Sequence, residues 1–225
     1  MLLPGLDGTG LFFEPLLKAL PSSHAVRVIS FPTDKMLGYE QLSVLVTSHL
    51  PDGPIILLGE SFSGPLAAII AHENQTWIRG LILAASFVSS PKPRFLRHFL
   101  PFPGLPQLGK KLARLALLGR YSNPEIVGLL KQIIPGLPAR LVRFRAELVL
   151  NADYGIQLQS TRCPVLILNA SEDFLVSQRS AQQLKKLRPD AIVATLPAPH
   201  MLLQTRPKEC AKEISNFIAN LSMAP

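Results

Sequence analysis

The sequence predicts an α/β fold in which a mostly parallel sheet is covered by helices on both faces. Short runs of Leu, Ile, Val and Ala alternate along the chain with segments of helical periodicity, which is the pattern of repeated strand and helix units. The strand-like runs are apolar at every position, as buried parallel strands are. A chain of 225 residues with 48% hydrophobic and 17% charged residues is enough for one large core.

About six strands are expected, with five helices between them. The first strand is a stub at the start of the chain, so we expect either a minimal or a truncated fold. The strand candidates are Leu2–Leu3, Ala25–Phe31, Pro54–Gly59, Gly80–Phe87, Pro164–Asn169 and Ala191–Leu196. The helix candidates lie near Phe12–Leu20, Tyr39–Leu50, Phe62–His72, Ser177–Leu187 and Pro207–Leu221.

The alternation of strands and helices is interrupted once, over residues 89–160. No strand is expected there, eight of the 21 prolines occur in it, and apolar residues recur at helical spacing in stretches such as Leu108–Leu118. We interpret this segment as a helical cap, or lid, inserted into a core formed by residues 1–88 and 161–225. Its apolar side chains are expected to pack on the core; the alternative is that they wall a substrate pocket or contact lipid.

The formal net charge of +8 resides in residues 91–160, which carry eleven basic and three acidic side chains. The stretch is strongly apolar and has no aromatic and basic reading motif, so no nucleic-acid binding is expected. A membrane surface or an anionic, fatty substrate fits this charge better. Peripheral contact with a membrane or lipid would place Lys110, Lys111 and Arg114 around the apolar face of the cap.

The cysteines and the N-terminus favour a cytoplasmic protein. Cys163 and Cys210 have no metal-ligand spacing and are too few for a disulfide framework. The N-terminus lacks the basic and long apolar regions of a signal peptide, and no apolar run reaches membrane-spanning length. No cluster of His, Asp or Glu has the spacing of a metal site, so no metal is expected.

Ser61 is the strongest candidate for a reactive residue. It lies in Ile-Ile-Leu-Leu-Gly-Glu-Ser-Phe-Ser-Gly-Pro-Leu-Ala-Ala, where an apolar strand turns into a helix around a serine. A strained turn of this kind raises the hydroxyl above the sheet and needs small residues two positions before and after the serine. Gly59 meets this demand, and Ser63 stands where Gly is usual, followed by Gly64. The alternative is an ordinary loop between strand and helix.

A glycine-rich loop follows the first strand, with the sequence Leu-Leu-Pro-Gly-Leu-Asp-Gly-Thr-Gly. Stabilising an oxyanion needs two backbone N–H donors, for which we expect Leu6 in this loop and Phe62 after the serine. Asp7 and Glu60, beside these donors, are candidates for substrate binding. Phosphate binding is the alternative for such a loop, but the chain has neither the Gly-Lys-Ser/Thr ending nor a full dinucleotide fingerprint.

An acid and a histidine follow two later strands. Asp173 comes just after the strand at 164–169, at the edge where open α/β sheets build their sites, with Glu172 in reserve. Capping of the next helix is the other explanation for Asp173. Of the five histidines, only His200 directly follows a predicted strand end. We expect His200 to take the proton of Ser61 and Asp173 to orient the imidazole.

Taken together, these motifs resemble those of the α/β-hydrolase superfamily over nearly the whole chain. The chain order Ser61, Asp173, His200 is the superfamily's order. The glycine-rich loop and the serine motif together are similar to those of small bacterial hydrolases and of the hydrolase-like part of plant phytyl ester synthases. The resemblance implies an α/β-hydrolase fold that lacks the first two strands of larger members, with strand order 4-3-5-6-7-8 in family terms. It also implies ester hydrolysis or acyl transfer without a metal or an organic cofactor.

The function expected from the sequence is that of a carboxylesterase-like serine hydrolase. It would cleave small-molecule carboxylic esters with short to medium, apolar acyl chains through an acyl-enzyme on Ser61. The first alternative is an acyltransferase or lipase that acts on long-chain acyl esters. The second is a binding protein that keeps the hydrolase fold without catalysis.

Overall fold

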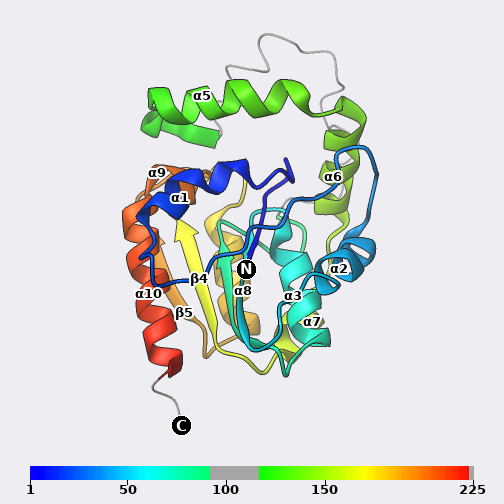
Figure 1. Ribbon diagram of the computed structural model, residues 1–225, viewed down its shortest axis with the longest axis vertical. Helices are drawn as coiled ribbons and strands as arrows, with labels where there is room; N and C mark the ends of the chain where they lie inside the picture. The colour runs from blue at the N-terminus through cyan, green and yellow to red at the C-terminus, as the bar shows by residue number, and fades with distance from the viewer. Residues whose placement is uncertain (92–116, 223–225) are drawn as a thin grey trace.

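Five parallel strands form a sheet at the centre of the computed structural model, which describes residues 1–91 and 117–222 (Figure 1). The strands lie across the sheet in chain order, and every neighbouring pair is parallel. They are β1 (Leu2–Leu3), β2 (Ile55–Glu60), β3 (Ile78–Ala84), β4 (Val165–Ala170) and β5 (Ile192–Leu196). The predicted parallel sheet is therefore present.

The strand expected at Ala25–Phe31 is reduced to a single bridge, between Val28 and Leu2. Two hydrogen bonds fix it: Leu2 N donates to Arg27 O at 2.8 Å, and Ile29 N donates to Leu2 O at 3.0 Å. Since β1 has only two residues, its free edge offers this segment one pairing position. The order across the sheet is still the one that the resemblance implied.

Alternate residues of the strands face two separate apolar cores, as expected for a sheet covered on both sides. Leu57 and Leu81 belong to one core, and Leu58 and Ile82 to the other. The first core is completed by helices α2 (Tyr39–Thr47), α3 (Ser63–Glu73), α7 (Gly155–Ser160) and α8 (Gln178–Leu187). The second is completed by the 3-10 helix η1 (Leu11–Phe13), α1 (Glu14–Ala19), α9 (Leu202–Thr205) and α10 (Pro207–Ser222).

Helices occupy the described part of the segment between β3 and β4. They are η3 (Gly119–Tyr121), α5 (Pro124–Ile133), η4 (Ile134–Gly136), α6 (Ala139–Asn151) and the core helix α7. In Figure 1, α5 lies above the carboxyl end of β4, and α6 runs down one side of the molecule. Ile126 and Leu129 of α5 pack with Phe12 and Met201. Most of the stretch 108–118, including Lys110, Lys111 and Arg114, lies outside the described residues.

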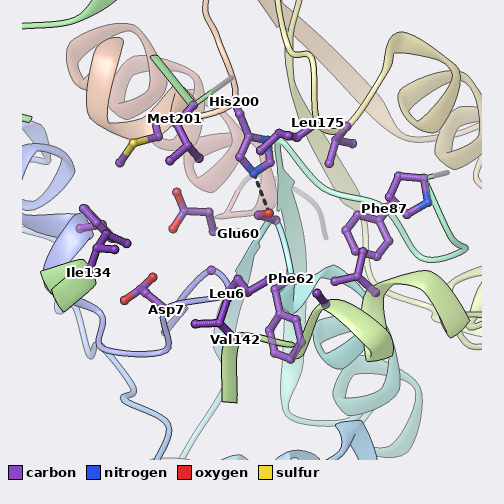
Figure 2. A pocket seen from close by; sticks show the side chains of 18 of the residues that line it. Leu6, Asp7, Glu60, Phe62, Phe87, Ile134, Val142, Leu175, His200 and Met201 are labelled. Atoms are coloured by element: carbon purple, nitrogen blue, oxygen red, sulfur yellow. Dashed lines mark hydrogen bonds between the residues drawn. The ribbon is translucent and has the colours of Figure 1, made fainter. Parts of the chain in front are cut away.

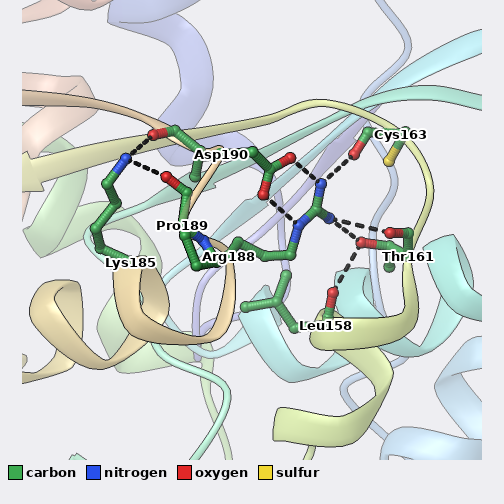
Figure 3. A network of polar contacts seen from close by, with 8 residues as sticks. Leu158, Thr161, Cys163, Lys185, Arg188, Pro189 and Asp190 are labelled. Carbon is green, nitrogen blue, oxygen red and sulfur yellow. Dashed lines mark hydrogen bonds and ion pairs between the residues drawn. The ribbon is translucent and has the colours of Figure 1, made fainter.

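Arg188 joins two loops at the amino ends of β4 and β5 (Figure 3). Its buried guanidinium donates to the carbonyl oxygens of Thr161 and Cys163, at 3.2 and 2.9 Å, and pairs with Asp190. These bonds hold the turn after α8 against the loop that leads into β4.

Among the helices of residues 1–91 and 117–222, none combines the length and the apolar character that a membrane-spanning helix needs.

The turn between β2 and α3 depends on two glycines. A Cβ at Gly59 would lie 2.6 Å from the carbonyl oxygen of Ser63, and one at Gly64 would overlap the Ser86 hydroxyl and the Phe87 carbonyl oxygen. The approach of helix to strand thus needs hydrogen at both positions. The sequence pattern places the small residue after Ser61 at position 63. Ser63 is fully buried and donates its hydroxyl to Pro4 O, but the closest approach is at Gly64.

We predict that Gly64→Ala lowers the free energy of unfolding by about 1–3 kcal/mol, because the added methyl group overlaps two buried oxygen atoms. The matched control is Gly128→Ala in α5, where a Cβ meets no atom of residues 1–91 and 117–222 within 4 Å. There Ala should be neutral or stabilising by up to about 1 kcal/mol, because Ala is the better helix former. Urea unfolding of both variants checks this, and equal stability of the two would contradict it.

Candidate active site

Ser61 lies at the tip of the turn between β2 and α3, with a left-handed backbone at φ 47°. A non-glycine residue in this conformation is strained and needs support from its surroundings. Ser61 N donates to Ala84 O at 2.9 Å, and the Ser86 hydroxyl donates to Ser61 O at 2.6 Å. Hydrogen bonds on both sides of the residue therefore hold it in the strained conformation, and its hydroxyl faces a cavity.

Ser61, His200 and Asp173 form one hydrogen-bonded chain. The Ser61 Oγ lies 2.8 Å from His200 Nε2, and His200 Nδ1 lies 2.7 Å from Asp173 Oδ2 (Figure 2 shows the first bond). Because the carboxylate accepts from Nδ1–H, Nε2 is left as the acceptor for the serine hydroxyl. The Asp173 side chain is 1% exposed, and its Oδ1 accepts from the backbone N–H of Leu175 and Val176 at 2.7 and 2.8 Å. The three residues predicted to act together are thus in contact.

Glu172, the reserve acid, turns to the surface. Its Oε1 accepts from Tyr121 Oη at 2.6 Å and from Arg120 Nη2 at 2.7 Å. These hydrogen bonds lower the pKa of the Glu172 carboxyl. The neighbouring acids therefore have different partners, and only Asp173 reaches the histidine.

The two expected oxyanion donors, Leu6 and Phe62, both line the cavity beside Ser61 (Figure 2). Among the described residues, neither backbone N–H donates to a carbonyl oxygen. The Phe62 carbonyl accepts from Tyr39 Oη at 3.0 Å, and the two rings stack with centroids 4.9 Å apart. Both amides are therefore available beside the serine hydroxyl.

Arg145 of α6 holds the loop that carries Leu6, a role that the sequence analysis missed. It is 2% exposed and donates to Leu6 O and Asp7 O at 2.8 Å and to Pro32 O at 3.0 Å. The guanidinium also lies 5.9 Å from the centroid of the Phe62 ring. Burial lowers the pKa of Arg145. In the sequence it was one of eleven basic residues in its segment, and no local signal set it apart.

The cavity has a volume of about 400 Å³ and a mostly apolar lining. Asp7 and Glu60, the expected substrate-binding residues, both line the cavity. Gln204, which the sequence analysis did not single out, lines it too. Besides Leu6 and Phe62, the apolar side chains that line it are Phe12, Phe87, Pro91, Leu117, Leu130, Ile134, Leu137, Val142, Ala146, Val149, Leu150, Leu175, Val176 and Met201.

The carboxyl groups of Asp7 and Glu60 have raised pKa values. Burial, with a contribution from Asp7, raises the pKa of Glu60 to about 7, and burial also raises the pKa of Asp7.

The described residues offer neither a metal-ligand cluster nor an activated cysteine. In residues 1–91 and 117–222, no group of three or more His, Cys, Asp or Glu side chains could hold a metal ion. Cys163 and Cys210 are buried as free thiols, and burial raises their pKa values to about 11 and 12. Neither thiol has the lowered pKa of a reactive cysteine.

Comparison with known proteins places the chain in a family. Residues 1–213 match the model of the alpha/beta hydrolase family, and the chain belongs to that family. It is 37% identical over 101 residues to phytyl ester synthase 1, chloroplastic, from Arabidopsis thaliana. This match spans 40% of the chain and 14% of the relative.

Solved structures show the same fold. An enol-lactonase from Burkholderia xenovorans superposes with a TM-score of 0.79 at 16% identity, covering 97% of this chain and 90% of that one. An esterase from Exiguobacterium antarcticum gives a TM-score of 0.81 at 13% identity, with the same coverage. The family match makes the chain an α/β hydrolase, and the solved structures, at these identities, show that it shares their fold.

We predict that Arg145→Met lowers the free energy of unfolding by about 3 kcal/mol, because it leaves three backbone carbonyl groups without their donor. Arg143→Met is the matched control on the same helix, since Arg143 is exposed and pairs with Glu147. Its loss should stay below about 1 kcal/mol. Thermal or urea unfolding measures both, and a control loss as large as that of Arg145→Met would refute the assigned role.

Proposed function

We propose that the protein is a serine hydrolase that cleaves carboxylic esters through an acyl-enzyme on Ser61. The observation that carries the proposal is the hydrogen-bonded chain from Ser61 through His200 to the buried Asp173. Such a chain lets the histidine take the serine proton, while the carboxylate stabilises the imidazolium that forms. The strained turn that presents Ser61 to the cavity supports the same role.

The reaction would proceed in two steps. The Ser61 oxygen attacks the ester carbonyl as its proton moves to His200 Nε2, and the amides of Leu6 and Phe62 stabilise the oxyanion. His200 then gives that proton to the leaving alcohol, and the acyl group remains on Ser61. Water then attacks the acyl carbon as it loses a proton to His200, and His200 gives this proton to Ser61 Oγ as the bond to the acyl group breaks and the carboxylic acid leaves.

The size of the cavity favours the proposal that the acyl chains of the substrate are short to medium in length. Its volume of about 400 Å³ is near the lower end of the range of about 300–1,000 Å³ for small-molecule pockets. Side chains from α5 and α6, such as Leu130, Val142 and Val149, line the side away from the sheet. We therefore propose that the part of the predicted cap, residues 89–160, that precedes α7 covers the substrate pocket; α7 itself packs in the first core.

Acyl transfer from a long-chain donor is the second candidate, and the similarity to a phytyl ester synthase favours it. Hydrolysis of p-nitrophenyl esters of increasing chain length, with and without an added alcohol, separates the two. The esterase proposal predicts turnover without the alcohol and a maximum at short or medium chains. Dependence on the alcohol would favour the transferase instead.

We predict that a fluorophosphonate probe labels the wild type and that Ser61→Ala abolishes both the labelling and ester hydrolysis. The reason is that the probe requires an activated serine, and Ser61 is the serine bonded to His200. Mass spectrometry of the labelled peptide identifies the site. An unlabelled wild type would refute both enzymatic candidates and leave the non-catalytic binding protein.

We also predict that Asp173→Asn lowers kcat by about 10³–10⁴-fold, because an amide favours the wrong histidine tautomer. The matched control is Glu172→Gln, whose side chain pairs with Arg120 at the surface. That variant should stay within about threefold of the wild type, because exposed pairs contribute little. Steady-state kinetics on one ester measures both, and equal losses would overturn the choice of Asp173.

A further inference from the structure

One wall of the cavity beside Ser61 carries polar side chains that the proposed reaction does not use. Apart from Ser61 and His200, the polar side chains among the described lining residues are Asp7, Glu60 and Gln204. No Lys, Arg, Thr or Tyr is among the described residues that line the cavity. We call these three residues the polar subsite.

The two carboxyl groups of the polar subsite face the same space. A Cβ built on Gly5 would lie 3.8 Å from Asp7 Oδ1, 3.8 Å from Glu60 Oε2 and 3.9 Å from Ser61 Cβ. The other oxygen of each carboxyl is occupied: Asp7 Oδ2 accepts from Thr9, and Glu60 Oε1 accepts from Gln204 Nε2 at 2.7 Å. Figure 2 shows both carboxyl groups directed into the cavity on the same side of the bond between Ser61 and His200.

Gln204 provides an independent sign that a hydrogen-bond donor is missing. The residue is 3% exposed and lines the cavity. Its Nε2 donates to Glu60, but its Oε1 is buried and has no hydrogen-bond partner within the described part of the chain. A buried acceptor without a donor is costly, so such a group points to a ligand or a water that donates to it.

We infer that the polar subsite binds a free hydroxyl group of the substrate, so that the enzyme prefers partial esters of diols or polyols over simple alkyl esters. This inference rests on the proposed function. The buried Gln204 Oε1 without a partner calls for a ligand that donates, and two carboxyl groups disfavour a carboxylate or phosphate.

A hydroxyl group suits the subsite better than an ammonium group does. The raised pKa of Glu60, about 7, means that its carboxyl is present in both protonation states near neutral pH. A hydroxyl donates to the carboxylate and accepts from the acid, whereas an ammonium can only donate. The apolar remainder of the cavity also makes an unpaired cation costly to bind.

The hydroxyl belongs to the alcohol portion of the ester. Glu60 lies beside His200 in Figure 2. Because His200 gives its proton to the leaving alcohol oxygen, the atoms attached to that oxygen lie next to Glu60. A hydroxyl one or two carbons beyond the ester oxygen is therefore close to the subsite.

The experiment compares two esters of the same size, ethylene glycol monobutyrate and propyl butyrate, which differ by a hydroxyl in place of a methyl group. Release of butyric acid is followed by pH-stat titration. In the wild type, kcat/KM should be about tenfold or more higher for the hydroxyl ester, as expected for a hydrogen bond to a charged group. Propyl 4-hydroxybutyrate, compared with propyl butyrate, tests for a hydroxyl on the acyl portion.

Two variants connect the preference to the subsite. Glu60→Met, which keeps the side-chain length without an acceptor, should bring the ratio of kcat/KM values to about one, while Glu60→Gln should keep part of the preference. Glu14→Met, at an exposed position on α1, is the matched control and should keep the wild-type ratio. Circular dichroism confirms that each variant is folded.

The outcomes separate this inference from the proposed function. Equal rates for the two butyrate esters in the wild type, or a preference that persists in Glu60→Met, would overturn the hydroxyl subsite while leaving the esterase intact. A preference only for the 4-hydroxybutyrate ester would overturn the assignment to the alcohol portion. Failure of the proposed function is recognised differently, by the absence of any turnover that Ser61→Ala abolishes.

Discussion

The geometry of the site depends on the turn that holds Ser61 at a positive φ between β2 and α3. A strained residue persists only where its surroundings over-determine it. Here the close packing of α3 on the sheet, which requires glycine at positions 59 and 64, combines with hydrogen bonds from the Ser61 amide and to its carbonyl group. The position of the serine hydroxyl is therefore set by the packing of the core, and the loops that bring His200 and Asp173 meet it there.

The segment between β3 and β4 contributes to the site at two levels. Side chains of α5 and α6 form part of the cavity wall, and Arg145 of α6 reaches past that wall to the glycine-rich loop. A buried guanidinium is costly unless its N–H groups are hydrogen-bonded, and three backbone carbonyl groups serve that purpose here. The backbone that presents Leu6 is thus tied to the same helix that lines the substrate pocket.

The buried carboxyl group of Glu60 in the polar subsite lowers the stability of the folded chain at neutral pH. Burial raises the pKa of Glu60 to about 7, so its ionised form is less favourable in the folded chain than in water. Unfolding restores the ordinary pKa, and the folded state therefore loses stability as the pH rises from about 4.5 to 7. Groups that are kept at such a cost are concentrated at functional sites, which accords with the role inferred for Glu60.

Local sequence patterns were enough to predict the α/β class, the parallel sheet and the site residues Ser61, Asp173 and His200. Each of these three residues follows an apolar strand, and the period and length of a strand are local properties. Tertiary structure decided what local patterns do not encode. It reduced Ala25–Phe31 to one bridge because the edge strand is two residues long, and it directed Glu172 away from the histidine that Asp173 reaches. It also brought Arg145 and Gln204 to the site, since their partners are more than 100 residues away along the chain.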